Sequence, residues 1–85
     1  MEVNIREQAF DDLSEMDNTT YLFFLKRVMK IAQIPPRRHM KFGMPFNIEE
    51  IGQGRIVYQI EEDKLFVIRC FADHKDYERW YRSKK

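Results

Sequence analysis

The sequence predicts a single α+β domain, residues 1–85, in which a short strand and a helical hairpin pack on a small, mainly antiparallel sheet of about four strands. Two observations carry this prediction. Apolar residues recur at helical spacing over residues 9–32, whereas the alternating and continuous apolar runs typical of strands fill residues 54–71. A chain of 85 residues supports only a small core, which seven Phe, four Tyr and one Trp help to fill.

The N-terminal segment predicts a short strand and a first helix. Glu2–Ile5 is the candidate strand, with alternate residues on the same face. The following helix has an apolar stripe of Ala9, Phe10, Leu13 and Met16 and an outer face of Asp11, Asp12 and Glu15. Residues 17–20 then supply N-cap side chains for a second helix. Because this connection is so short, the two helices are expected to form an antiparallel hairpin.

The second helix is expected to have a wide apolar face and a basic polar face. The apolar face consists of Tyr21, Leu22, Phe24, Leu25, Val28, Met29, Ile31 and Ala32. The polar face consists of Lys26, Arg27, Lys30 and Gln33. Pro35 and Pro36 end the helix, since neither residue donates a backbone hydrogen bond and Ile34 is disfavoured in the α region.

The segment that follows has no clean period and is interpreted as a loop leading to an edge strand over residues 46–51. Basic and aromatic side chains are interleaved in this loop, which combines phosphate contacts with surfaces for base stacking. The candidate RNA-binding residues are Arg37, Arg38, Lys41 and Phe42. An equally compatible interpretation is that the loop's aromatic residues cover an open end of the core.

The run GRIVYQIEEDKLFVIRCF, residues 54–71, predicts a β-hairpin. Its first strand alternates, its polar centre at residues 61–64 is the turn, and residues 65–71 form the continuous apolar run of a central strand covered on both faces. The glycines of residues 52–54 predict a tight turn before it, since glycine adopts positive φ readily. Cys70 lies in the apolar run and is interpreted as a small buried side chain rather than a nucleophile.

A short final helix is expected over residues 76–84, with Trp80 as a packing anchor. Polar residues precede it directly after the last strand. Arg55 at the head of one strand, and His74, Lys75 and Tyr77 after the end of the next, are therefore expected to converge on one edge of the sheet. This convergence is the main sequence indication of a functional site.

Charge is segregated along a chain whose net charge is only +1. Residues 21–47 and 67–85 each carry six bases, with no acid in the first segment and three in the second. If the two basic segments meet in space, they form a positive surface suited to a polyanion. The alternative is a set of separate solvated faces.

Several classes of protein lack support in the sequence. No apolar run approaches the ~20 residues of a membrane span, and the N-terminus has no apolar signal region. The two histidines have no zinc-site spacing, and no phosphate-binding glycine loop is present. We therefore expect no membrane segment, metal or small-molecule cofactor, and the single cysteine fits the reducing cytoplasm.

The hairpin sequence and the HKDY that follows it resemble the central hairpin and closing motif of the RelE/ParE superfamily of toxins from toxin–antitoxin pairs. The preceding strand and helical hairpin also match, so the resemblance covers nearly the whole chain. It implies a RelE-like fold and a cognate antitoxin as partner. For the RelE-like, YoeB-like and HigB-like members, it further implies a ribosome-dependent mRNA endoribonuclease acting in the ribosomal A site.

The resemblance also implies roles for individual residues. Arg55 matches the hairpin arginine that contacts the scissile phosphate, and His74, Lys75 and Tyr77 match the C-terminal cluster of acid/base and stacking groups. Lys41 lies where RelE-type members place basic residues. ParE-like members instead inhibit DNA gyrase and lack the catalytic set, so a gyrase inhibitor or a non-catalytic binder is the alternative. This chain departs from RelE-type members in being less basic and in extending its C-terminal helix.

Metal-independent RNA cleavage by 2′-hydroxyl attack requires a base, a stabiliser of phosphorane charge and an acid for the leaving oxygen. Arg55 suits the second role, because its guanidinium stays protonated and binds two phosphate oxygens. His74 suits either proton-transfer role. Glu49 or Glu50 is a candidate base, with a surface charge as the alternative. Structural alternatives for Arg55 and His74 are a salt bridge within the hairpin and a locally bonded turn residue.

Overall fold

The computed structural model describes residues 1–34 and 46–83. In chain order the elements are β1 (Glu2–Ile5), α1 (Glu7–Ser14), α2 (Asn18–Gln33), β2 (Asn47–Ile51), β3 (Gly54–Glu61), β4 (Lys64–Phe71) and α3 (His74–Ser83). The predicted RNA-binding residues Arg37, Arg38, Lys41 and Phe42 lie outside the described residues. None of the described helices is long and apolar enough to cross a membrane.

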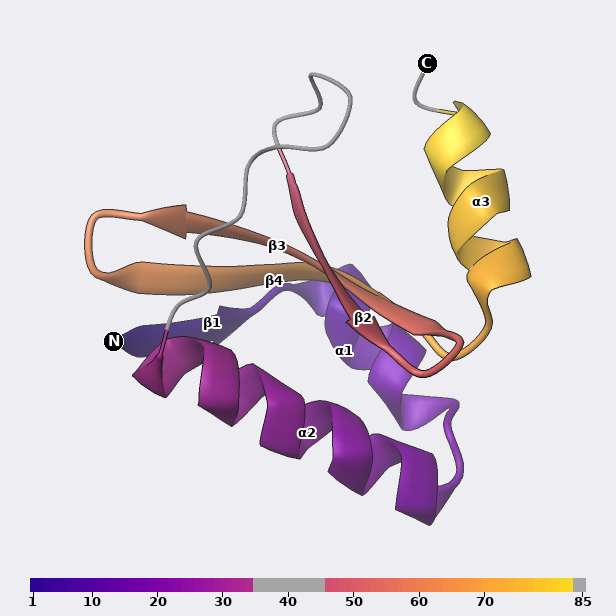
Figure 1. The fold of residues 1–85 in the computed structure, drawn as a ribbon, viewed down its shortest axis with the longest axis horizontal. Helices are drawn as coiled ribbons and strands as arrows, with labels where there is room; N and C mark the ends of the chain where they lie inside the picture. Colours follow the sequence, from indigo (N-terminus) through magenta and orange to yellow (C-terminus); the bar gives the residue numbers. More distant parts are fainter. Residues whose placement is uncertain (35–45, 84–85) are drawn as a thin grey trace.

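The sheet has four strands in the order β1-β4-β3-β2 (Figure 1). Strands β2, β3 and β4 are antiparallel neighbours, and β1 is parallel to β4. Gly52, at φ 61°, begins the turn between β2 and β3, and Glu62, at φ 56°, begins the turn between β3 and β4. The predicted α+β fold with a mainly antiparallel sheet is confirmed, and the first strand lies at an edge.

Helices cover the two faces of the sheet unequally. Helices α1 and α2 lie on one face, whereas α3 stands on the other (Figure 1). The core under α1 and α2 consists of Ala9, Leu13, Phe24, Val28, Ile31, Ala32, Ile56, Tyr58, Leu65, Val67 and Cys70. The core under α3 consists of Ile48, Val57, Phe71 and Tyr77, with Phe46, Ile68, Trp80 and Tyr81 packed against it. The sheet therefore has apolar side chains on both faces, as expected for β4.

A β-bulge explains how β4 serves both cores. The register is Val57 opposite Arg69 but Tyr58 opposite Val67, so Ile68 is the extra residue in β4. Such an insertion shifts the alternation of side chains by one position. As a result, Val67 and Cys70 both face α1 and α2, although simple alternation places them on opposite faces.

The apolar face of the helical hairpin is narrower than its sequence predicts. Phe10 is 60% exposed, Leu22 47% and Met29 53%. Phe24, Val28 and Ile31 bury one stripe of α2 against the sheet, and Leu22 and Met29 lie well round the helix from that stripe. The prediction that Phe10, Leu22 and Met29 belong to the apolar packing face was therefore wrong.

The predicted N-cap of the second helix is confirmed. The Asp17 carboxylate accepts a hydrogen bond from the Thr20 N–H at 2.7 Å, and this bond lowers the pKa of Asp17.

Asp12 does not face solvent, contrary to the prediction for the first helix. Its carboxylate accepts from Arg69 Nε at 2.7 Å and Nη2 at 3.0 Å, and from the backbone N–H of Cys70 at 3.0 Å. The parallel pairing of β1 ends at Ile5 opposite Val67, so β4 continues without that neighbour. Beyond this point the Asp12 carboxylate is the hydrogen-bond acceptor for the backbone N–H of Cys70. It also raises the pKa of the Arg69 guanidinium.

Helix α3 begins two residues before the predicted start. Asp73 causes the difference, because its carboxylate accepts from the Lys75 N–H at 2.9 Å and caps the first turn. His74 and Lys75 therefore belong to the helix rather than to a polar connection.

Gly54 is required for space rather than for positive φ. A Cβ at this position would lie 2.6 Å from Phe24 Cζ and 2.9 Å from the Phe71 carbonyl oxygen. We expect Gly54→Ala to lower the free energy of unfolding by about 1–3 kcal/mol, the usual cost of overpacking, in urea denaturation. Gly52→Asn is the control, because no atom lies within 4 Å of a Cβ there and Asn tolerates positive φ. Equal stability of the two variants would contradict this account.

Replacing Asp12 tests the contact between α1 and β4. Asp12→Ala leaves the Arg69 charge and the Cys70 N–H without their partner, so we expect a loss of about 2–3 kcal/mol in the free energy of unfolding. Asp11→Ala, at an exposed position of the same helix, is expected to cost less than about 0.5 kcal/mol. A thermal or urea melt of both proteins measures the difference, and similar losses would refute the assigned role.

Candidate active site

Arg55 lies near the start of β3, on the face of the sheet that α3 covers. Its cross-strand neighbours are Glu50 in β2 and Phe71 in β4. Nη1 donates to the carbonyl oxygens of Gly54 at 2.8 Å and Gly52 at 3.3 Å. These bonds hold the guanidinium over the β2–β3 turn. The salt bridge to a hairpin acid that was the structural alternative does not occur among the described residues.

Tyr77 lies against this guanidinium. Arg55 Cζ is 5.9 Å from the centroid of the Tyr77 ring, a cation–π distance. The ring also packs against Phe71 and Tyr81, with centroids 6.0 Å away in both cases, and the residue is only 6% exposed. Burial is the main cause that raises the pKa of Tyr77, and the charge of Arg55 opposes the rise. The structure thus brings Arg55 and Tyr77 together, with the tyrosine as part of the core under α3.

His74 stands at the first turn of α3, three residues before Tyr77 and therefore on nearly the same side of the helix. Its Nδ1 lies 3.5 Å from Asp73 Oδ1, and its side chain is 40% exposed. The imidazole is therefore accessible to solvent and has a carboxylate beside it.

Lys75 is exposed on a different side of α3. With Glu78, Arg79 and Arg82 it lines a shallow surface hollow on the helix. The structure therefore does not bring Lys75 together with Arg55 and Tyr77.

Trp80 packs inward as predicted. The centroid of its ring lies 5.6 Å from that of Phe46 and 5.7 Å from that of Phe71.

The two adjacent glutamates of β2 point to opposite faces of the sheet. Glu49 is 8% exposed and its Oε2 accepts from Arg27 Nη1 of α2 at 2.8 Å. Glu50 is exposed, lies opposite Arg55, and is close enough to help raise the pKa of Tyr77. Sequence reasoning left the two equivalent. Strand alternation decides between them, and Glu50 is the carboxylate of the candidate site.

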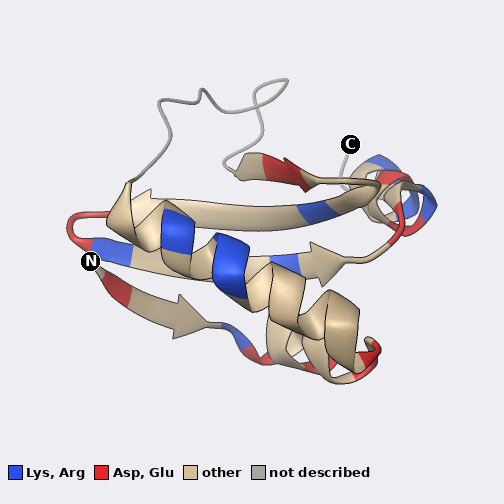
Figure 2. Ribbon diagram, turned by 60° about the horizontal axis from the view of Figure 1, so that its bottom comes forward, with Lys and Arg blue, Asp and Glu red and all other residues tan. Residues whose placement is uncertain are grey.

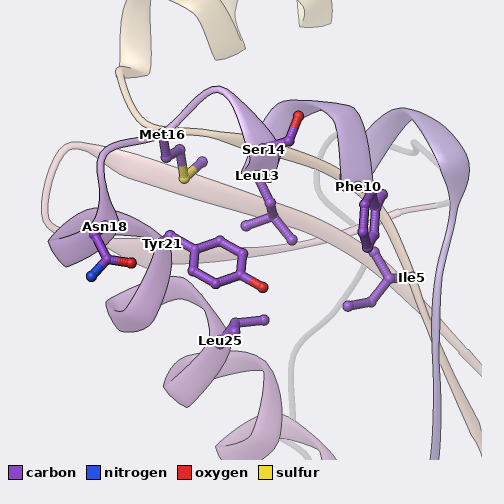
Figure 3. Close-up of a pocket in the computed structure, with 8 residues that line it drawn as sticks. All are labelled: Ile5, Phe10, Leu13, Ser14, Met16, Asn18, Tyr21 and Leu25. Carbon is purple, nitrogen blue, oxygen red and sulfur yellow. The ribbon is translucent and has the colours of Figure 1, made fainter.

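Hollows also lie elsewhere on the described part of the molecule. Figure 3 shows a mainly apolar pocket of about 370 Å³ between α1, α2 and β1, lined by residues that include Phe10, Leu13 and Tyr21. A second hollow, of about 440 Å³, lies between α1 and α3 and is lined by residues that include Asp12 and Arg69. In residues 1–34 and 46–83 no group of three or more His, Cys, Asp or Glu side chains is placed to hold a metal ion.

The described bases do not form one positive surface. The bases of α2 lie over one face of the sheet and those of α3 over the other (Figure 2). Among the residues that the structure describes, the bases of α2 and α3 therefore form separate faces, whereas Arg37, Arg38 and Lys41 of the first basic segment lie outside those residues. Near the candidate site, the positive charge comes from Arg55, and Glu50 lies opposite it on the neighbouring strand.

The fold is that of the RelE toxins. A mutant of the E. coli toxin RelE in its free state has a TM-score of 0.75 and 19% identity, over 94% of this chain and 90% of that chain. The E. coli RelBE toxin–antitoxin complex gives 0.71 and 16%, over 82% and 93%. The RelB–RelE complex of Methanococcus jannaschii gives 0.70 and 10%, over 92% and 98%. The sequence itself matches no protein-family model and no curated protein.

Cys70 provides a pH-dependent test of this face of β4. It is 2% exposed, and burial is the main cause that raises its pKa from 9.0 to about 12. An acid whose pKa is raised on folding loses folding stability as the pH rises between these two values. We expect iodoacetamide at pH 9 to alkylate the native protein at least about a hundredfold more slowly than the urea-unfolded chain, because little thiolate is present. Comparable alkylation rates for the native and the unfolded protein would show that the Cys70 thiol is accessible to the reagent, contrary to this prediction.

Proposed function

We propose that this chain is the toxin of a toxin–antitoxin pair and that it cleaves mRNA in the ribosomal A site, in the cytoplasm, without a metal ion. The RelE fold supports the first part, since two of the structures compared above are complexes of a toxin with an antitoxin. One observation carries the second part: Glu50, Arg55 and Tyr77 lie together beside the first turn of α3, where His74 is exposed.

The proposed reaction transfers a phosphoryl group within the RNA. The Glu50 carboxylate removes the proton of a 2′-hydroxyl, and the 2′ oxygen attacks the adjacent phosphorus. The bond to the 5′ oxygen of the next nucleotide breaks, and that oxygen takes a proton from the His74 imidazolium. The products are a 2′,3′-cyclic phosphate and a 5′-hydroxyl, so atoms and charges balance.

Arg55 stabilises the phosphorane in this proposal. The Gly52 and Gly54 carbonyls engage only Nη1, which leaves the N–H groups of Nε and Nη2 for two phosphate oxygens. Tyr77 supports the guanidinium through the face of its ring. Lys75 contributes phosphate contacts from the outer side of α3. Arg37, Arg38, Lys41 and Phe42 are proposed contacts to the RNA backbone and bases.

A non-catalytic binder with the same fold, such as a DNA gyrase inhibitor, is the second candidate. The observation that favours it is the low exposure of Tyr77, which at 6% offers no ring face for stacking a base. The outward position of Lys75 also favours a non-catalytic binder, because it leaves Arg55 as the one Lys or Arg of the described residues at the site.

Cleavage of a ribosome-bound message, mapped by primer extension, tests the proposal. We expect Arg55→Ala, Glu50→Gln and His74→Ala each to lower the rate about a hundredfold or more, since each removes a group that acts in the transition state. Substitution of a 2′-deoxy nucleotide at the cleaved position is expected to abolish cleavage, because it removes the attacking hydroxyl.

Glu49→Gln is the matched control, because this neighbouring carboxylate serves the contact with Arg27 on the other face. It is expected to retain cleavage while lowering the melting temperature. If the well-folded parent cleaves no message, the nuclease proposal is wrong, and inhibition of gyrase supercoiling becomes the next measurement. If Glu49→Gln loses cleavage and Glu50→Gln does not, the assignment of the base is wrong.

A further inference from the structure

The mainly apolar pocket between α1, α2 and β1 has a volume of about 370 Å³ and lies on the side of the sheet away from α3. Helix α1 packs mainly on β4 and makes little contact with α2, so a hollow remains between the two helices. Phe10 lines this hollow and is 60% exposed, although its place in the sequence predicts a packing residue. The volume falls within the range of about 300–1,000 Å³ that small-molecule sites occupy, and an apolar, aromatic lining is typical of such sites.

Tyr21 places a polar group inside this apolar lining. Its ring points into the pocket, and Figure 3 shows the hydroxyl oxygen directed toward the side where Ile5 and Phe10 lie. None of the described residues forms a hydrogen bond with this hydroxyl. A tyrosine hydroxyl both donates and accepts, so it is available to a polar group of a ligand. One such contact within an apolar site fixes the orientation of the ligand.

The lining of the pocket favours a neutral ligand. Among the described residues, no charged side chain lines it. The other polar side chains of the lining are Ser14, whose hydroxyl donates to the Asp11 carbonyl oxygen at 2.7 Å, and Asn18 at the start of α2. A carboxylate, phosphate or ammonium group would lose hydration there without gaining an ion pair. Fatty acids, nucleotides and polyamines are therefore poor candidates.

We propose that this pocket binds a small, uncharged aromatic molecule that has one hydrogen-bonding group, such as an indole or a phenol. Its rings pack among Phe10, Leu13 and Leu25, and its polar group bonds the Tyr21 hydroxyl. An apolar cavity of about 150 Å³ binds benzene, so the larger volume here has room for two fused rings. The pocket and Tyr77 lie on opposite sides of the sheet, so the proposal stands whether or not the chain cleaves RNA.

Titration with indole, followed through the amide NMR shifts of the isotope-labelled protein, tests this pocket. We expect saturable shifts at the amides around Phe10 and Tyr21, with a Kd of about 1 mM or lower for a ligand of this size. Indole-3-acetate has the same rings and adds a carboxylate. We expect it to bind at least about tenfold more weakly than indole, because the lining offers no cation to its charge.

Variants locate the ligand and its polar contact. Tyr21→Phe keeps the ring and removes the hydroxyl, so we expect it to weaken indole about fivefold, the usual effect of one hydrogen bond. Indene, which has the same shape and no N–H group, is expected to change less than about twofold in this variant. Ser14→Trp fills the pocket from its rim and is expected to abolish binding. Gln8→Trp adds the same side chain at an exposed position on another side of α1 and is the control that retains binding. Circular dichroism checks that each variant is folded.

Four outcomes would overturn the proposal. A lack of saturable shifts with indole up to about 5 mM would mean that the pocket takes no ligand of this class. Indole binding that survives Ser14→Trp would place the ligand elsewhere on the protein. Equal affinity for indole and indole-3-acetate would contradict the selection of a neutral molecule, and an unchanged indole affinity in Tyr21→Phe would contradict the polar contact. None of these measurements involves RNA, so a failure here is distinguishable from a failure of the proposed cleavage.

Discussion

The carboxylate of Asp12 is the contact on which the arrangement of the layers depends. It joins α1 to β4 at the point where β1 has ended, by accepting from the Arg69 side chain and from the Cys70 backbone. The same guanidinium lies 4.8 Å from the ring centroid of Phe71, in the core under α3. One half-buried charged pair therefore connects the helical layer, the bulged strand and the second core, and removing either partner leaves the other's charge without its ion-pair partner.

The two faces of the sheet perform different tasks. Helices α1 and α2 bury most of the apolar side chains, and their ion pair from Arg27 to Glu49 fixes α2 to the edge strand. The opposite face has the smaller core and the candidate site. Because adjacent residues of a strand point to opposite faces, Glu49 serves structure and Glu50 faces Arg55. A carboxylate and a guanidinium are thus placed across one strand pair without a long loop.

Similarity of fold does not by itself fix the chemistry of this chain. Structures at 10–19% identity share its architecture, so the fold tolerates replacement of most side chains. Function depends on the few groups at the site. Here Arg55 is held by carbonyl groups of its own turn and by a buried tyrosine, an arrangement that limits the conformations of the guanidinium before any substrate binds.

The sequence alone determined the order of the elements, the α+β class, the N-cap at Asp17 and the residues available for chemistry, because these follow from local periodicity and capping. Its resemblance to the RelE/ParE superfamily extended this to the fold. Only the tertiary structure decided which side chains meet. The bulge at Ile68 shifted the alternation of β4, Asp73 extended α3 to include His74, and Asp12 turned inward to Arg69. These outcomes depend on contacts between segments far apart in the chain, for which a single sequence has no local signal.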